Sequence, residues 1–123
     1  MLLAIDHIEI IVKDVDATVA WYRSLGLELV RRTDHHGASA ELRLPSGTVI
    51  ELHQVEKEEN IGINHIAFRV EDGEAAAGRL EELGIPIEAG PKYFEPTGRT
   101  LVNFRDPAGW RLQLVSHDSK ERG

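Results

Sequence analysis

The sequence contains no cysteine among its 123 residues. This absence excludes disulfide bonds, thiolate metal ligands and a cysteine nucleophile. The sequence also lacks an apolar run near the roughly 18 residues that a membrane-spanning helix needs, and no basic-then-apolar signal segment stands at its start. We therefore expect a soluble, cytoplasmic protein.

Positive charge is scarce as well. Lysine and arginine number 14 against 21 aspartate and glutamate residues, and the formal net charge is −7. Proteins that bind a phosphate backbone usually carry a basic patch, and no cluster of lysine or arginine is present here. We expect neither nucleic acid nor a membrane as a partner, which leaves a small molecule. The length fits a single domain with a sizeable core.

An internal repeat organises what is present. The segment 6–14 (DHIEIIVKD) has the same layout as the segment 64–72 (NHIAFRVED), so that His7 and His65 are 58 positions apart (65 minus 7). Each segment reads as an apolar strand that carries a histidine near its start and runs into an acidic helix cap. The chain therefore consists of two copies of one structural unit.

Hydrophobic period and turn residues divide each copy into elements. In the first copy, a strand over 3–12 precedes a helix that Asp14 or Asp16 caps and that Gly26 ends. One face of this helix is apolar, formed by Val15, Val19, Tyr22 and Leu25. Further strands are expected at 27–33, 38–44 and 48–55. The second copy repeats the order, with a strand at 63–70, a helix from about 74 to 83, and strands at 85–89, 99–104 and 110–115.

These elements predict an α+β fold made of two βαβββ modules, at about 3–55 and 63–116. Both modules belong to one domain over 1–118, and a disordered tail is expected at 119–123. The segment 91–98 holds the extra residues of the second copy. It is expected to be a loop, either a long hairpin connection or a lid that carries Tyr93 over the site.

Four polar residues occupy matching places in the two copies. His7 and His65 begin the modules, and the match of 47–52 (GTVIEL) with 109–114 (GWRLQL) makes Glu51 and Gln113 equivalent. Buried polar groups within apolar strands need partners. Two imidazoles, a carboxylate and an amide oxygen suit a divalent metal ion. The alternative is that the histidines are hydrogen-bonded residues of the core or the sheet edge.

The paired modules, the segment 65–72 (HIAFRVED) and the ending D-P-x-G-x-x-x-Q-L at 106–114 resemble the vicinal oxygen chelate superfamily, over residues 3 to about 116. The resemblance implies a cupped mixed sheet around one divalent ion per site (Zn, Ni, Mn, Co or Fe). It carries the four ligand positions onto His7, Glu51, His65 and Gln113, and it implies a homodimer.

Departures from the family's members narrow the expected reaction. Extradiol dioxygenases and fosfomycin-resistance proteins take a carboxylate from the final strand, where this chain has Gln113. Glyoxalase I has an arginine for glutathione where this chain has Ile11, which argues against glutathione. Methylmalonyl-CoA epimerase has the same ligand types, with the glutamine and the glutamate exchanged between modules.

The resemblance to glyoxalase I and the epimerase implies a lyase or an isomerase that forms an enediolate during proton transfer on a small oxygenated substrate. Glu51 is expected to be both metal ligand and catalytic base. Two alternatives stay open: a metal-free module that sequesters a ligand, as bleomycin-resistance proteins do, and an iron-dependent dioxygenase. Besides Tyr93, the residues expected to contact substrate are His53, which shares a strand face with Glu51, and Arg69, which shares one with His65.

Overall fold

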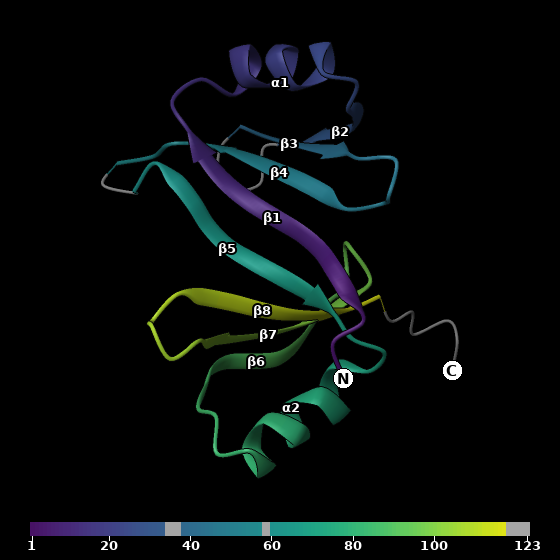
Figure 1. Cartoon of the computed structure of the whole chain (residues 1–123), viewed down its shortest axis with the longest axis vertical. Coiled ribbons are helices and arrows are strands. Elements are labelled where there is room, and N and C mark those ends of the chain that lie inside the picture. The colour runs from purple at the N-terminus through teal and green to yellow at the C-terminus, as the bar shows by residue number, and fades with distance from the viewer. Residues whose placement is uncertain (34–37, 58–59, 118–123) are drawn as a thin grey trace. The chain divides into compact units, whose positions relative to one another are not determined.

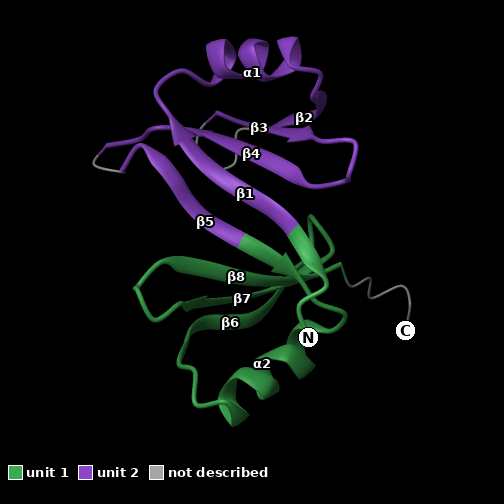
Figure 2. Cartoon of the chain, in the orientation of Figure 1, with its two compact units in different colours: residues 1–5, 67–123 green, residues 6–66 purple. Residues whose placement is uncertain are grey.

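The computed structural model describes residues 1–33, 38–57 and 60–117 (Figure 1). It contains two helices and eight strands in the order β1-α1-β2-β3-β4-β5-α2-β6-β7-β8. They divide into two compact units, one over Asp6–Ile66 and the other over Met1–Ile5 with Ala67–Gly123 (Figure 2). The tail expected at 119–123 lies outside the described residues.

The unit Asp6–Ile66 is the first module together with the start of the second module's first strand. Its elements are β1 (Ala4–Val12, from Asp6 on), α1 (Val15–Ser24), β2 (Glu28–Thr33), β3 (Ser39–Arg43), β4 (Val49–Gln54) and the first residues of β5 (Gly62–Arg69). The strand order is β2-β3-β4-β1-β5. β1 pairs with β4 in parallel, whereas β3 pairs with both β2 and β4 antiparallel.

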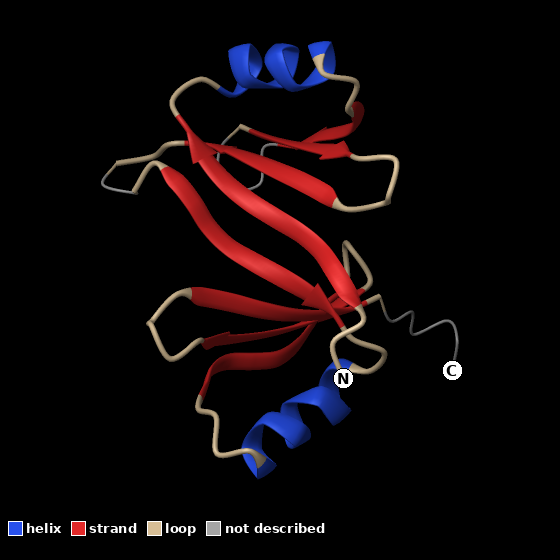
Figure 3. Ribbon diagram, viewed as in Figure 1, coloured by secondary structure: helices blue, strands red, loops and turns tan. Residues whose placement is uncertain are grey.

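The second unit repeats this plan (Figure 3). It holds the end of β5, α2 (Gly73–Glu82), β6 (Ile87–Phe94), β7 (Arg99–Arg105) and β8 (Arg111–Ser116). Its strand order is β5-β8-β7-β6, with β7 antiparallel to both of its neighbours. The expected order of strand, helix and three strands is therefore confirmed in both modules.

Each helix covers one face of the strands of its own unit, because strand side chains alternate between faces. Val15 and Val19 of α1 pack on a cluster of β3 and β4 residues: Ala40, Leu42, Ile50 and Leu52. Ala76, Ala77 and Leu80 of α2 pack on Val70, Val102, Phe104 and Leu114. The opposite strand faces carry the polar residues His7, Glu51, His65 and Gln113 together with buried apolar residues such as Ile11 and Val115.

The helix boundaries follow the capping residues. Asp14, not Asp16, is the N-cap of α1, and its carboxylate accepts a hydrogen bond from the backbone N–H of Ala17 at 3.0 Å. Asp72 caps α2 in the same way. Gly26 follows α1 with a φ of 101°, a left-handed conformation that glycine adopts without steric cost.

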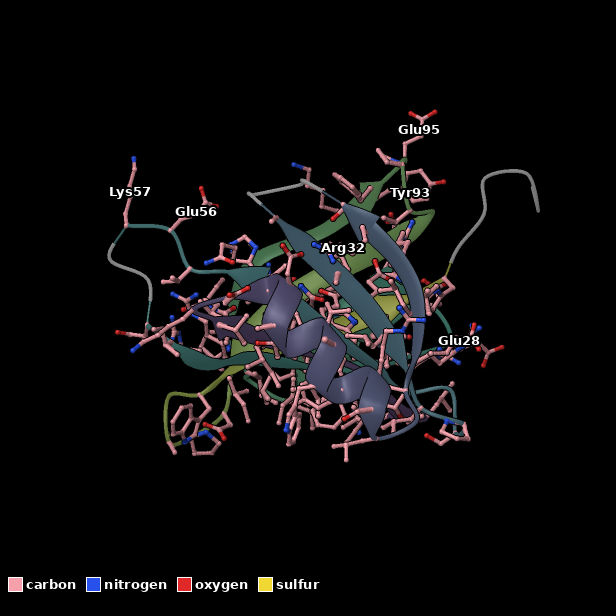
Figure 4. All side chains as sticks on the ribbon, turned by 90° about the horizontal axis from the view of Figure 1, so that it is seen from above. Glu28, Arg32, Glu56, Lys57, Tyr93 and Glu95 are labelled. Atoms are coloured by element: carbon pink, nitrogen blue, oxygen red, sulfur yellow. The ribbon has the colours of Figure 1, made fainter. Side chains whose placement is uncertain are left out.

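The expectation of a loop at 91–98 is wrong for its first half. β6 continues to Phe94, because Lys92, Tyr93 and Phe94 pair with Leu101, Thr100 and Arg99 of β7. The strand is irregular between Ala89 and Lys92, and this irregularity accommodates the extra residues of the second module. Only a short turn near Glu95 connects the two strands, so Tyr93 lies on a paired strand rather than in a long loop (Figure 4).

Among the described residues, none of the helices combines the length and the apolar composition required to cross a membrane.

The start of α2 depends on the absence of a side chain at Gly73. A Cβ atom there would lie 2.7 Å from Cγ2 of Thr100 and 3.0 Å from Oγ of Ser116. The Gly73 backbone N–H also donates a hydrogen bond to that hydroxyl at 3.0 Å. Close packing leaves no room for an added methyl group without displacing the helix.

We therefore predict that Gly73→Ala lowers the free energy of unfolding by about 1–3 kcal/mol, the usual cost of overpacking. Chemical denaturation would measure the change. Gly78→Ala is the matched control, because no atom lies within 4 Å of the added Cβ and alanine favours a helix, so stability should rise by about 0.5–1 kcal/mol. Adding Thr100→Ser, which removes Cγ2, should recover part of the Gly73→Ala loss. Equal effects of the two glycine substitutions would contradict the packing argument.

Candidate metal centre

Three of the four expected ligands lie in the unit Asp6–Ile66, on the sheet face that α1 does not cover. In the parallel pair of β1 and β4, His7 is opposite Val49 and Glu9 is opposite Glu51. His7 and Glu51 therefore occupy neighbouring positions on one face. His65 enters the same place from β5, which follows β1 in the strand order.

The two imidazoles face each other. Nε2 of His7 lies 3.2 Å from Nε2 of His65, and the rings meet edge to face with an interplanar angle of 79°. The residue before each histidine holds the other ring nitrogen: Asp6 Oδ2 lies 2.8 Å from Nδ1 of His7, and Asn64 Oδ1 lies 2.9 Å from Nδ1 of His65. In both rings, Nδ1 is thus held by the preceding residue, and Nε2 faces the Nε2 of the opposite ring.

This spacing suits two ligands of one metal ion. Zinc binds imidazole nitrogen at about 2.0–2.1 Å, so two such nitrogens at octahedral or tetrahedral angles are roughly 2.8–3.4 Å apart. Glu51 places Oε2 at 3.8 Å from Nε2 of His7, and its side chain is 20% exposed. Among the residues that the structure describes, no three His, Cys, Asp or Glu side chains already converge on a single cation position. The imidazole pair is in place, whereas the Glu51 carboxylate would have to turn to join it.

Gln113 belongs to the other unit, where it is opposite Asn103 in the pairing of β7 with β8. It is buried, and its Nε2 donates a hydrogen bond to Asn103 Oδ1 at 3.0 Å. This bond orients the amide, so that its oxygen is the atom suited to coordination. Its role as the fourth ligand stays a prediction.

His53 lies two residues after Glu51 on β4 and therefore on the same face. It is only 8% exposed. Its Nδ1 is 3.2 Å from Oγ of Ser39 on β3, and its Nε2 is 3.5 Å from a carboxylate oxygen of Glu56, whose side chain extends to the surface (Figure 4). His53 is thus a held ring beside the candidate centre, which is compatible with the expected contact to substrate.

The other two expected substrate residues are placed differently. Arg69 is exposed at the end of β5. Tyr93 is opposite Thr100, which shares a strand face with Val102 of the α2 core, whereas Gln113 lies on the other face with Asn103. Substrate contact by either residue stays a prediction.

Carboxylates line the face around the imidazole pair. Glu51 is opposite Glu9 on β1 and opposite Glu41 on β3, so three carboxylates form one row across three strands. Like charges in such positions repel each other unless cations reduce the repulsion. Arg31 does so at one end, with Nε 2.9 Å from Oε2 of Glu41. A cation beside Glu51 would reduce the repulsion within this row in the same way.

Sequence reasoning did not assign roles to Asp6, Asn64, Ser39 and Glu41. A signal was available for the first two residues, because each immediately precedes a histidine of the repeat and both can accept a hydrogen bond. Ser39 and Glu41 are assigned only by the register of β3 with β4, which no local pattern specifies.

Comparison with known proteins assigns the class. Residues 4–114 match the family model described as Glyoxalase/Bleomycin resistance protein/Dioxygenase superfamily. The match covers nearly the whole chain, and the chain belongs to this superfamily.

Epimerases are prominent among its relatives. The chain is 35% identical over 101 residues to an ethylmalonyl-CoA/methylmalonyl-CoA epimerase of Cereibacter sphaeroides, covering 71% of this chain and 75% of that protein. A variant of the Streptomyces coelicolor methylmalonyl-CoA epimerase, solved in complex with 2-nitronate-propionyl-CoA, has a TM-score of 0.78 at 25% identity, covering 97% of this chain and 100% of that one.

A third similarity concerns the fold alone. The methylmalonyl-CoA epimerase of Mycobacterium tuberculosis has a TM-score of 0.84 at 24% identity, covering 98% of this chain and 92% of that chain. Together these matches confirm the expected fold class, an α+β fold with two βαβββ modules in a mixed sheet.

The geometry predicts that metal binding requires both facing imidazoles. His7→Ala and His65→Ala should each reduce bound divalent metal from about one ion per chain to near zero, because each substitution removes one nitrogen of the pair. Elemental mass spectrometry of purified, untagged protein would measure this. His53→Ala is the matched control, since its ring is held by Ser39 and Glu56 and should not be needed for metal. Metal retained after loss of either His7 or His65 would contradict the assignment.

Proposed function

We propose that this protein is a divalent-metal-dependent isomerase that epimerises the α-carbon of a small acyl-CoA thioester. The observation that carries the proposal is the pair of imidazoles whose Nε2 atoms face each other at 3.2 Å. The substrate class rests on the Cereibacter sphaeroides relative, an ethylmalonyl-CoA/methylmalonyl-CoA epimerase. His7, His65, Glu51 and Gln113 are the proposed ligands.

The donor set suits Zn, Ni, Mn, Co or Fe, because imidazole and carboxylate ligands accept all of these ions. When bound, the ion supplies Lewis-acid polarisation of a substrate carbonyl, which lowers the cost of removing the neighbouring α-proton. His7 and His65 would hold the ion through ring nitrogens, Glu51 through a carboxylate oxygen and Gln113 through its amide oxygen, and such a set would leave room for oxygen atoms of the substrate.

Glu51 is the proposed base. It would remove the proton from the α-carbon and leave an enolate, then return a proton to the same carbon. A carboxylate has two oxygens, so one can contact the ion while the other accepts the proton. Proton delivery to the opposite face gives the epimer, and it requires either a second proton donor on that face or reorientation of the planar enolate before Glu51 returns the proton; no atom or electron is gained or lost overall. Gln113 cannot accept this proton and would act only as a ligand.

His53, Arg69 and Tyr93 are the proposed substrate contacts. His53 is the strongest of the three, since it lies next to Glu51 on one strand face and is held in place by Ser39. Arg69 could pair with a carboxylate or phosphate of the substrate. Tyr93, on its paired strand, offers an aromatic surface and a hydroxyl at the β6–β7 turn rather than a lid.

The rival functions make different demands on the same residues. A metal-free sequestering module has no use for two imidazoles that each direct a nitrogen to one point. An iron-dependent dioxygenase would use His7, His65 and Glu51 as a facial triad and would consume oxygen. Oxygen uptake by protein reconstituted with iron under anaerobic conditions separates this reaction from proton transfer, which consumes none.

We predict that Glu51 acts as both metal ligand and base, whereas Gln113 acts as a ligand only. In deuterium oxide, the protein loaded with metal should exchange the α-proton of methylmalonyl-CoA or ethylmalonyl-CoA for deuterium, which proton NMR measures directly. Glu51→Ala should lose both metal and exchange. Glu51→Gln keeps an oxygen ligand but no base, so exchange should fall by about 10²–10⁴, the usual contribution of a positioned base.

Gln113→Ala should weaken metal binding but leave measurable exchange when excess metal is supplied. Equal and complete loss of exchange in the Glu51 and Gln113 variants, with both saturated by metal, would show that Glu51 has no role peculiar to a base. Absence of exchange in the metal-loaded wild type with both thioesters would overturn the proposed substrate class.

A further inference from the structure

We infer that Asp6 and Asn64 are positioning residues that fix His7 and His65 in the tautomer that presents Nε2 to a cation, and that the Asp6 carboxylate strengthens the resulting site. The inference rests on the metal centre of the proposed function. It assigns roles to two residues that are not among the four proposed ligands.

The hydrogen-bonding chemistry of the two neighbours determines the tautomers. A carboxylate can only accept a hydrogen bond, so the contact of 2.8 Å between Asp6 Oδ2 and His7 Nδ1 places a proton on that nitrogen. The amide oxygen of Asn64, 2.9 Å from Nδ1 of His65, is likewise an acceptor. In both neutral rings the proton is therefore on Nδ1, and Nε2 carries a lone pair.

Two lone pairs that face each other at 3.2 Å repel unless a positive charge lies between them. The contact of 3.2 Å is also within hydrogen-bonding distance, so the positive charge between the rings can be one additional proton that one Nε2 donates to the other. Because Asp6 and Asn64 hold a proton at each Nδ1, a metal ion between the two Nε2 atoms would replace only that one proton.

The two neighbours are equivalent in the repeat but differ in charge. Asp6 is 3% exposed, so its contact with the His7 ring is shielded from solvent. Glu51 is the other carboxylate within ion-pair distance of the His7 ring among the described residues, at 3.8 Å. Asn64 brings an amide to the equivalent place, so of the two histidines only His7 has a carboxylate hydrogen-bonded to its ring through the preceding residue.

A carboxylate hydrogen-bonded to an imidazole also increases electron density on the ring and strengthens its bond to a metal ion. Such partners typically contribute 10–100-fold to metal affinity. Asp6 should therefore contribute more than Asn64, although the two occupy equivalent positions.

The experiment uses the full chain with Asp6→Ala, Asp6→Asn, Asn64→Ala, and the exchange variant that combines Asp6→Asn with Asn64→Asp. The tautomers are read in metal-free protein at alkaline pH from long-range proton–nitrogen NMR correlations of the histidine rings. Wild type should show His7 and His65 with the proton on Nδ1. Asp6→Ala should shift His7 toward the form with the proton on Nε2, and Asn64→Ala should do so for His65.

Zinc affinity, measured by competition with a chromophoric chelator, is the second measurement. Asp6→Ala should weaken binding by about 10–100-fold and Asn64→Ala by less. The exchange variant restores one carboxylate and one amide with their places reversed, so it should recover most of the affinity that Asp6→Asn loses. Asp14→Asn is the matched control: it removes a carboxylate from the same unit, where Asp14 caps α1, and should leave zinc affinity unchanged.

Two results would overturn the inference. One is a wild type in which His7 and His65 carry the proton on Nε2. The other is unchanged zinc affinity in Asp6→Ala and Asn64→Ala with both variants folded, because a purely structural role predicts that outcome. A wild type that binds no zinc but has both protons on Nδ1 would refute the proposed metal centre and retain the tautomer assignment, so the two failures are distinguishable.

Discussion

The contact between His7 and His65 is the constraint on which the candidate centre depends. Each ring belongs to a strand whose alternate residues are apolar, so the sheet determines which way the ring points. One nitrogen of each ring is held by the preceding residue, and the second is directed at its counterpart 3.2 Å away. The other polar groups on this face differ in their distance from the two rings. Glu51 Oε2 lies 3.8 Å from Nε2 of His7, and His53 is two residues further along the same strand.

The centre combines symmetry in position with asymmetry in charge. The repeat supplies two histidines, the acceptor that precedes each of them, and one polar residue late in each module. Asp6 and Glu51 are charged, whereas Asn64 and Gln113 are their neutral equivalents. In these pairs of equivalent positions, both carboxylates belong to the first module. The relatives of known structure include methylmalonyl-CoA epimerases.

Much of the fold could be predicted because its signals are local. Asp14 and Asp72 cap helices through hydrogen bonds to residues two or three positions away, and Gly26 ends α1 through its own backbone conformation. The length of β6 could not be predicted. β6 extends to Phe94 because Phe94 pairs with Arg99 of β7, after an irregularity in the strand. The prolines and the glycine of the segment 91–98 are typical of a loop, and they give no indication of this register.

The candidate site likewise contains residues that the sequence predicted and residues that it could not predict. The repeat identified His7 and His65, and their contact confirms that the two equivalent positions meet. The neighbours on β3 were not predictable, because Ser39 and Glu41 reach the site only through a register shared with β4. A sequence pattern can predict which face of a strand a side chain lies on. It does not predict which residue of the neighbouring strand lies opposite, because that depends on the register between segments that are far apart in the sequence.

The 58-residue separation of the two histidines has a consequence for folding. In an unfolded chain the two rings are far apart, and bringing them together has the entropic cost of closing a long loop. A cation held between them would bind the native chain in preference to the unfolded one and act as a removable cross-link between β1 and β5. Metal occupancy and conformational stability would then be thermodynamically linked, so that chelation would lower the free energy of unfolding.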